Sequence, residues 1–535
     1  MDRDLFAQEA IAQIPKILTL LDRNRHSPNY GCFDRNYWQY KIIDFPSGMA
    51  QEFVYPLALA YDTDIANNPF YQHPSIPAWV EAGILFAAKS AHPDASCDDY
   101  FPFEKAGGAA AFSLLAFIES YQLLGLNNQA ILDFLIKRAD WLAHHQESGR
   151  LTNHQALIVL CLGLLSRLIK TDRWQKAQEE RLEQVLSWQN PEGWFQEYEG
   201  CDPGYHTLTI SCLARIYQLN PNNRVKDAIA RAVILASQFI HPDGSYGGEY
   251  TSRNTYNYFP HGFELVGKWL PEALNINDRF LKGLAKGLAP CYADDHIIGH
   301  HTWNYLLAWR DFVAERPPLK PHKEGRFALE EGGILIDRRQ NSELYVGLNK
   351  GGVFKLFQND KLLVSDTHFS LIVVDSGKVK NAVGHLVSKN NRIQLDTDEI
   401  TIEGSLGWAK QKQMTTFNLV VLRLVMFTVG RFNPDAIRKI LQKILITGKK
   451  TAPFTFRRQL QWVGDHWLIR DELYAKSWEG VTAAAIGCDQ TSIYVVMSRT
   501  FQAGQLQPWL DCTKQVKSLK PDQPLVIERA LLNRQ

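Results

Sequence analysis

The sequence predicts an α+β protein of two domains, an N-terminal (α/α) toroid of helix-pair repeats followed by a C-terminal antiparallel β-sandwich. Two observations carry this prediction. Glycine-containing turns recur at similar spacing through the N-terminal half. After a proline-rich run at 315–322, the hydrophobic period changes from that of a helix to that of a strand. A chain of 535 residues is also too long for one hydrophobic core, so two or three domains are expected.

The helical part comes first. Apolar residues recur at i, i+3, i+4 and i+7 in 109–124, 131–144, 154–169 and 224–239. The connections place Gly149, Gly193 and Gly244 where a turn needs a positive φ. These glycines stand 44 and 51 residues apart, a length that two helices and two connections fill. Helix pairs stack into an open solenoid or close into a ring, and the Pro-[Asp/Glu]-Gly-aromatic turn resembles those of (α/α) toroids; three unrelated turns are the alternative.

The predicted domains are residues 1–314 for the toroid, 315–325 for a linker and 326–535 for the β-sandwich. Prolines in the linker block helix continuation and stiffen the join. Short strands separated by polar turns then favour an antiparallel sandwich, interrupted by one helix at 435–445. The predicted strands are 333–337, 343–347, 353–357, 369–374, 400–404 and 492–497.

Composition limits the partners and the compartment. Lys plus Arg is 58 and Asp plus Glu is 57, so the overall charge predicts neither nucleic acid nor a membrane as partner. Residues 1–25 lack the apolar run of a signal peptide, and the apolar stretch 417–432 contains two arginines and is too short to span a bilayer. Eight scattered cysteines without a CxxC pair fit a reducing compartment. A cytoplasmic location is expected, and the oligomeric state stays open.

Polar clusters follow each repeat turn, near the start of the next helix. Equivalent positions in a closed repeat lie on one rim, so side chains that are distant in sequence are expected to converge on one cleft. The residues expected there are Asn153, His154, Tyr205, His206, Arg253, Asn254 and His261.

One pattern within this set resembles a known family. An Asn-His pair, Asn153 and His154, opens one inner helix, and Tyr205 stands 52 positions after Asn153. Together with the segments 193–205 and 243–254, this pattern resembles the heparinase II/III-like polysaccharide lyases and related alginate lyases. The resemblance implies a toroid with a β-sandwich, an acidic oligosaccharide or polysaccharide as partner, and β-elimination beside a uronate carboxylate.

The chemistry of elimination assigns the roles that the resemblance implies. Asn153, with Arg253, would hold the uronate carboxylate while enolate-like charge develops. His154 or a second histidine, with His261 as candidate, would take the C5 proton, and Tyr205 would protonate O4 of the leaving sugar. The alternatives are that Asn153 is only a helix N-cap, that His154 is a surface histidine and that Tyr205 packs between helices.

Aromatic and histidine side chains complete the predicted substrate site. Tyr37, Trp38 and Trp194 could stack on sugar rings; the alternative is that they pin their segments to the toroid. Arg253, Asn254 and His206 are the predicted polar contacts. Lyases of this group usually bring a further histidine from the β domain, sometimes with a metal nearby, and here that stretch keeps only His368.

This departure leaves three reactions open. A uronate-directed lyase is the first choice, a uronate C5-epimerase the second, and a non-catalytic glycan-binding protein the third. No cofactor is predicted, although a zinc or calcium ion in the β domain stays open. The spacing of His296, His300 and His301 could also bind zinc, but polar helix packing is favoured there.

Overall fold

The computed structural model describes residues 2–531 except 148, 198–199, 289–296, 410–414, 443–449, 489–505 and 507. The strand predicted at 492–497, the end of the helix predicted at 435–445, and His296 lie outside the described residues.

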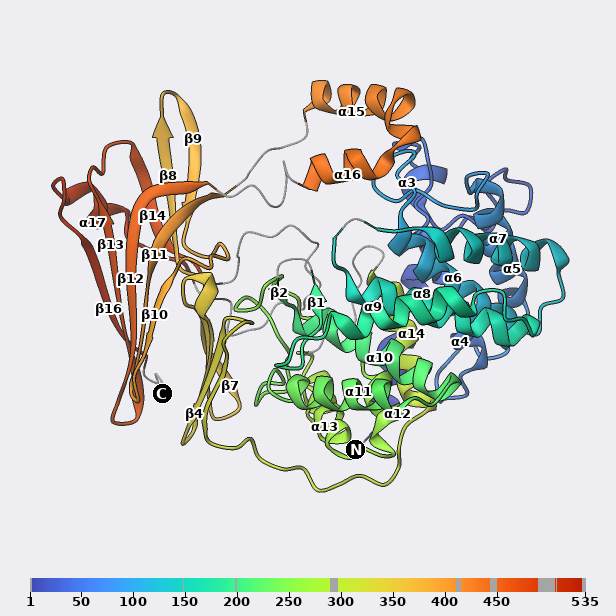
Figure 1. The fold of residues 1–535 in the computed structure, drawn as a ribbon, viewed down its shortest axis with the longest axis horizontal. Helices are drawn as coiled ribbons and strands as arrows, with labels where there is room; N and C mark the ends of the chain where they lie inside the picture. Colours follow the sequence, from blue (N-terminus) through green and yellow to red (C-terminus); the bar gives the residue numbers. More distant parts are fainter. Residues whose placement is uncertain are drawn as a thin grey trace.

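The helices close into a ring. Six inner helices pack each on the next, and α14 packs on α4 to complete the circle (Figure 1). The inner helices are α4 (Val54–Asp62), α6 (Gly107–Leu123), α8 (Thr152–Ile169), α10 (Pro203–Leu219), α12 (His261–Gly267) and α14 (Ile297–Arg310). The predicted toroid is therefore confirmed, and the open solenoid is excluded.

An outer layer of helices surrounds this ring. Each outer helix packs on its inner partner, and α1 packs on both α13 and α14, so the first helix of the chain completes the last pair. The outer helices are α1 (Asp4–Ile11), α5 (Ser75–Ser90), α7 (Gln129–His144), α9 (Gln175–Ser187), α11 (Asn223–Ala236) and α13 (Glu272–Ala285). Short elements decorate the rim: α2 (Ile14–Leu20), α3 (Arg35–Trp38), η1 (Ala50–Phe53), β1 (Gln196–Glu197) and β2 (Gly200–Cys201).

The repeat turns need glycine for two reasons. Gly149, Gly193 and Gly244 all have positive φ, of 96°, 100° and 94°. At Gly193 a Cβ would also lie 2.9 Å from the Arg231 carbonyl oxygen, and at Gly244 it would lie 2.4 Å from the Gly283 nitrogen. The turns therefore set both the chain reversal and the close approach of the next outer helix.

Beyond Arg310 the chain holds no helix or strand until β3 begins at Gly325. Five strands then form an antiparallel sheet in sequence order. They are β3 (Gly325–Leu329), β4 (Ile334–Arg339), β5 (Ser342–Gly347), β6 (Val353–Gln358) and β7 (Lys361–Asp366), with η2 (Leu348–Lys350) between β5 and β6.

A second antiparallel sheet covers the first. Its order is β15-β14-β8-β9-β11-β12-β13-β16, and β10 pairs with β11. Its strands are β8 (Phe369–Asp375), β9 (Lys378–Val383), β10 (Arg392–Leu395), β11 (Glu399–Ala409), β12 (Thr451–Val463), β13 (His466–Ala475), β14 (Val481–Ile486), β15 (Leu510–Asp511) and β16 (Leu525–Leu531); α17 (Thr513–Ser518) lies beside β14.

The five-stranded sheet has two buried faces because its strands alternate. In β4, Leu335 joins the core between the two sheets, whereas Ile334 and Ile336 join the toroid core. In β5, Leu344 likewise joins the core between the two sheets, and Tyr345 joins the toroid core. The first sheet is therefore sandwiched between the second sheet and the toroid, as the order of layers in Figure 1 shows.

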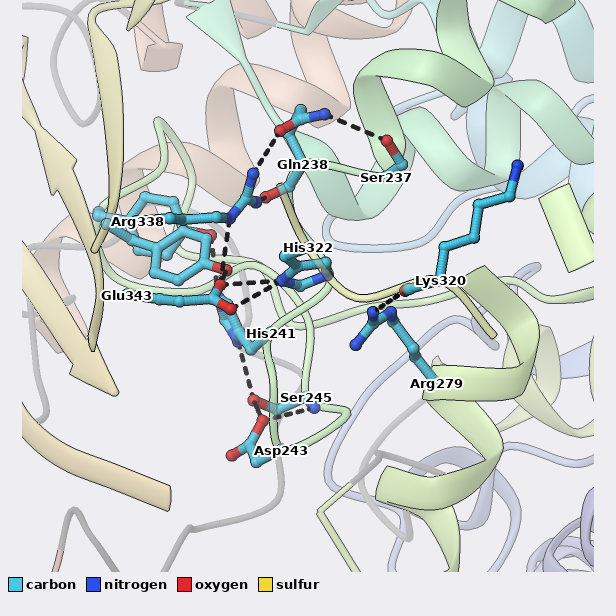
Figure 2. A network of polar contacts seen from close by, with 12 residues as sticks. Ser237, Gln238, His241, Asp243, Ser245, Arg279, Lys320, His322, Arg338 and Glu343 are labelled. Carbon is cyan, nitrogen blue, oxygen red and sulfur yellow. Dashed lines mark hydrogen bonds and ion pairs between the residues drawn. The ribbon is translucent and has the colours of Figure 1, made fainter. Parts of the chain in front are cut away.

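Polar contacts fix the sandwich on the toroid. Figure 2 shows Glu343 of β5 accepting hydrogen bonds from His322, at 2.9 Å, and from Arg338 of β4, at 3.2 Å. Arg338 also donates to the side chain and the carbonyl of Gln238, which follows α11, at 2.8 and 3.1 Å. Because His322 lies in the predicted linker, this segment is bound to the sheet.

A helical hairpin is inserted between β11 and β12. It consists of α15 (Thr416–Thr428), η3 (Gly430–Phe432) and α16 (Pro434–Gln442). Figure 1 places it near α3, on the toroid side of the sandwich. The helix predicted at 435–445 appears as α16 within the described residues, whereas the sequence did not predict α15 as a helix.

Candidate functional site

The starts of α8 and α10 are neighbours on one rim of the toroid, and the β1–β2 hairpin connects to both. Thr152 donates to the Gln196 carbonyl at 2.6 Å, which fixes the hairpin over the first turn of α8. Glu197 then receives two hydrogen bonds of 2.8 Å from Asn153, one from its backbone N–H and one from Nδ2. Asn153 is thus not the N-cap of α8; instead, Glu197 accepts one of the N–H groups that a helix start leaves unpaired.

Asp202 caps the next inner helix. Its Oδ1 accepts from the Gly204 N–H at 3.1 Å, and Pro203 occupies the first turn, where no N–H is needed. The Thr255 hydroxyl donates to the same carboxylate oxygen. A Cβ on Gly204 would lie 2.4 Å from the Thr255 hydroxyl, so glycine lets the 248–257 loop lie directly on the start of α10.

Arg253 of this loop lies among the groups described above. Its Nη1 is 3.6 Å from Glu197 Oε2, and its Nε is 3.4 Å from Asp202 Oδ2. The guanidinium carbon lies 4.6 Å from the centroid of the Tyr205 ring, within cation–π range. We call Asn153, Glu197, Asp202, Tyr205 and Arg253 the rim cluster.

The rim cluster has one guanidinium beside two carboxyl groups, and all five side chains are largely buried. Burial raises the pKa of Glu197 to about 7, against the opposing effects of Arg253 and of the Asn153 hydrogen bonds. Burial also raises the pKa of Asp202, again opposed by Arg253 and by the Thr255 hydroxyl. A carboxyl with a pKa near neutrality is typical of sites where protons are exchanged.

Two buried lysines of the β domain hold the 248–257 loop. Lys350 Nζ donates to the Glu249 carbonyl at 2.7 Å and to the Thr251 carbonyl at 2.8 Å, and it also bonds Asn254 Oδ1. Lys355 Nζ is 3.2 Å from Glu249 Oε2. Asn254 is therefore a structural residue with φ of +56°, and the β domain positions the loop that carries Arg253.

The structure places His206 and His261 away from the rim cluster, contrary to prediction. His206 Nε2 contacts the Ala232 carbonyl at 2.9 Å, between α10 and α11, and burial lowers its pKa to about 4. His261 begins α12, where it pairs with Asp311 at 2.8 Å.

An extended segment explains the position of His261. Thr255 lies against Gly204, but Gly262 donates to the hydroxyl of Ser211 at 2.9 Å. Seven residues of α10 separate these contacts, about 10 Å along the helix axis. The start of α12 therefore lies about two helical turns along the axis of α10 from the start of α10. For this reason it is not equivalent to the starts of α8 and α10.

His154 follows Asn153 in α8 but has different neighbours. Its Nδ1 lies 2.7 Å from Glu147 Oε2, and its ring meets the Phe112 ring edge-on at 6.2 Å. A Cβ on Gly108 would lie 2.5 Å from the ring, so this glycine makes room for it. The imidazole is partly exposed and is oriented by a carboxylate, an arrangement that suits a general base.

Each of the three predicted sugar-stacking aromatics contacts another part of the fold. The indole N–H of Trp194 donates to Glu192 at 2.8 Å, and the buried ring packs beside Gly332 of the β domain. Trp38 donates to the Leu20 carbonyl at 2.7 Å, and the Tyr37 ring contacts Phe86 of the outer helix α5. These contacts match the alternative that the sequence left open.

His368 belongs to the core of the β domain. Its Nδ1 accepts the Phe369 N–H at 2.7 Å, and its ring packs edge-on against Phe456 at 4.4 Å. Burial, followed by the charge of Arg458, keeps the pKa of His368 well below its ordinary value. In the structure His368 is thus a buried histidine with packing contacts, and its role as a substrate contact stays a prediction.

Metal ligation finds no support in the described part of the chain. No group of three or more His, Cys, Asp or Glu residues there is arranged to hold a metal ion. His300 pairs with Glu52 at 2.6 Å, and His301 contacts Asn257 at 3.1 Å, so these two histidines are engaged in polar packing.

Sequence reasoning missed Glu197, Asp202, Lys350 and Lys355. Glu197 and Asp202 lie inside the segment 193–205 that carries the family resemblance, and an acidic residue just before Pro203 is a helix-capping signal. The lysines had no such signal, because their partners are backbone carbonyls and carboxylates about 100 positions away.

No protein family model and no curated protein matches this sequence. Among solved structures, a Paenibacillus xanthan lyase aligns with a TM-score of 0.53 and 11% identity over 90% of this chain and 46% of that chain. Heparinase III (TM-score 0.48, 9% identity) covers 83% of this chain and 65% of its own. Chondroitin AC lyase of Streptomyces coelicolor (0.49, 9%) covers 90% and 67%.

This chain therefore spans less than half of the xanthan lyase that it matches. At 11% identity the likeness concerns the fold, a helical toroid followed by a β domain. The fold shared with this xanthan lyase, a helical toroid followed by a β domain, is the fold that the sequence resemblance predicts.

Proposed function

We propose that this protein cleaves a uronate-containing oligosaccharide or polysaccharide by β-elimination. The observation that carries the proposal is the rim cluster, in which Asn153, Tyr205 and Arg253 from three separate segments share contacts. The fold shared with a xanthan lyase supports a glycan-processing role.

The carboxylate of a uronate makes its C5 proton very weakly acidic, so its charge has to be balanced as the enolate forms. The Asn153 amide and the Arg253 guanidinium supply a neutral donor and a cation for this purpose. Glu197 binds Asn153 by two hydrogen bonds and pairs with Arg253, which holds both groups in one orientation.

The proton transfers are divided between two residues. His154 takes the C5 proton at Nε2, because its Nδ1–H is directed to Glu147 and the neutral ring then carries its lone pair on Nε2. The electrons form the C4–C5 double bond, the C4–O4 bond breaks, and the Tyr205 hydroxyl gives its proton to O4. The Arg253 guanidinium, lying over the Tyr205 ring, stabilises the resulting phenolate.

A substrate screen tests this proposal. The protein is incubated with hyaluronan, heparan, alginate and glucuronan oligomers, and the ultraviolet absorbance of an unsaturated uronate is followed. Appearance of this absorbance on at least one substrate is the expected result. Solvent deuterium at C5 without chain cleavage would instead identify a C5-epimerase, and binding with neither signal would identify a glycan-binding protein; either result refutes the lyase.

A further inference from the structure

Helix α15 exposes an apolar stripe to solvent. Phe417, Val420, Val421, Leu424 and Phe427 recur at the spacing of one helix face, and all are exposed, Phe417 by 75% and Leu424 by 64%. Phe432, in the turn after α15, is 77% exposed. In a soluble globular protein such a stripe normally faces the core.

The opposite face of α15 already has its partner, so the exposed stripe is not a misplaced core face. Met426 is buried, and Arg423 forms an ion pair of 3.0 Å with Asp44 of the toroid. Phe427 lies at the edge of the exposed stripe nearest to this face, and its ring meets that of Phe103 edge-on at 5.4 Å. Figure 1 shows α15 outermost in this part of the molecule.

The insertion that contains this hairpin is strongly basic. Residues 410–450 contain nine Lys and Arg residues and one acidic residue, Asp435. The rest of the chain then holds 49 basic and 56 acidic residues, so the near-neutral total conceals a segment of net charge +8. Among the described members, Arg431 in the turn after α15 and Lys439 on α16 are exposed.

We propose that the α15–α16 hairpin docks the protein on the surface of an anionic lipid bilayer. Thirteen residues of α-helix are about 20 Å long, short of the ~30 Å hydrocarbon core, so α15 lies in the interface and does not span it. Exposed Phe, Leu and Val beside Lys and Arg is the composition of an interfacial helix on anionic lipid. This proposal departs from the sequence-based expectation of no membrane partner, which rested on the total charge.

The charge also decides against other occupants. A second copy of the chain would bring one +8 segment against another, which opposes self-association through this face. A soluble acidic glycan would pair with the cations but would leave Phe417, Leu424 and Phe432 in water. A bilayer with anionic headgroups satisfies both the apolar stripe and the charge.

Vesicle co-sedimentation of the full chain tests the proposal. Vesicles of phosphatidylcholine with phosphatidylglycerol should bind the protein, and vesicles of phosphatidylcholine alone should bind it more weakly. Phe417→Asp with Leu424→Asp should weaken binding by about 30-fold or more, because two large apolar side chains no longer enter the interface. The matched control is Ile234→Asp with Val379→Asp, at apolar positions outside the hairpin that are 58% and 69% exposed, and it should bind like the wild type.

The charge contribution is tested separately. Arg431→Gln with Lys439→Gln should weaken binding to the anionic vesicles by about fivefold for each residue. Lys176→Gln with Arg392→Gln, on exposed side chains of α9 and β10, is the control. Circular dichroism confirms that each variant is folded.

Three outcomes would overturn the proposal. The first is unchanged vesicle binding by the Phe417→Asp, Leu424→Asp variant. The second is no vesicle binding together with self-association that these substitutions abolish, which would make the stripe a contact between copies. The third is no vesicle binding together with salt-sensitive binding of soluble heparin that Arg431→Gln and Lys439→Gln weaken. None of these results bears on the proposed lyase activity, which is measured on soluble oligosaccharides.

Discussion

Two buried networks of arginine and carboxylate occur in this molecule, and they differ in balance. In the β-sandwich, Arg458 and Arg529 each contact both Asp366 and Asp471, at distances between 2.5 and 2.8 Å. Two cations thus meet two anions, and the arginine charges hold the pKa of Asp366 far below its ordinary value despite burial. In the rim cluster, by contrast, one guanidinium faces two carboxyl groups at 3.4 and 3.6 Å.

This difference in the ratio of arginines to carboxyl groups distinguishes a network that stabilises the fold from one that can exchange protons. Paired charges with short contacts keep one protonation state over the whole physiological range, which suits a core. In the rim cluster burial raises the pKa of Glu197 to about 7 because the single guanidinium only partly opposes it, so Glu197 can exchange a proton near pH 7. The predictions below test this contrast, from the largest expected effect to the smallest.

Tyr205→Phe should lower kcat by about 10²- to 10⁴-fold on any uronate substrate, because it removes the proton donor. KM should stay close to the wild-type value, since only the hydroxyl is lost. Tyr217→Phe, near the far end of the same helix, is the matched control and should keep full turnover. Full turnover by Tyr205→Phe would rule out the elimination mechanism as assigned.

Arg458→Met should lower the free energy of unfolding by about 3–5 kcal/mol, because it leaves buried carboxylates with one cation fewer. Urea denaturation followed by circular dichroism measures the change. Arg224→Met breaks an exposed pair with Glu183 and should leave the urea midpoint unchanged. Equal effects of the two substitutions would contradict a structural role for the sandwich network.

Asn153→Ala should lower kcat/KM by about 10²-fold, as expected for loss of a donor to the developing charge. Its stability cost should be about 1 kcal/mol, the typical net value of a lost hydrogen bond. Asn222→Ala removes the N-cap of α11 at a similar cost in stability and should leave turnover intact. A loss of turnover in both variants would trace the effect to stability.

Glu197→Gln should change how stability depends on pH. Because burial raises the pKa of Glu197 to about 7 in the folded state, the wild type should lose stability as the pH rises from about 5 through 7. The glutamine variant should lack this loss and be the more stable protein at pH 8. Thermal melting at pH 5 and pH 8 measures both values, with Glu180→Gln on exposed α9 as control. A parallel pH dependence in wild type and Glu197→Gln would show that Glu197 does not titrate there.

Most of the fold could be predicted from the sequence because its signals are local. The predicted strands 343–347, 353–357 and 369–374 coincide with β5, β6 and β8 within one residue at each end. Helix α15 was missed because its apolar residues occupy more than one face, so no single amphipathic pattern stood out. The strand β12 was not predicted, although its alternating burial is the pattern of a half-exposed strand.

The positions of the candidate site residues were predicted less well than the fold. They depend on where each inner helix begins relative to its neighbours. The spacing of the repeat turns was enough to predict that Asn153, Tyr205 and Arg253 lie close together. The structure brings these three residues together. His261 was not placed correctly because residues 254–260, which form no helix or strand, shift the start of α12 along the axis of α10, an offset that repeat spacing does not encode. His206 failed because successive residues of a helix point about 100° apart, so a neighbour of Tyr205 faces the outer layer.

The packing of α1 on α13 and α14, which closes the toroid, has a consequence for folding during translation. Helix α1 is synthesised before its partners α13 and α14, and 286 positions separate the end of α1 from the start of α14. At about 5–20 residues per second, translation takes about 15–60 s to cover this distance. For that interval Phe6, Ala7, Ala10 and Ile11 have no apolar surface to join, so the nascent chain has to keep its first helix sheltered until the ring can close.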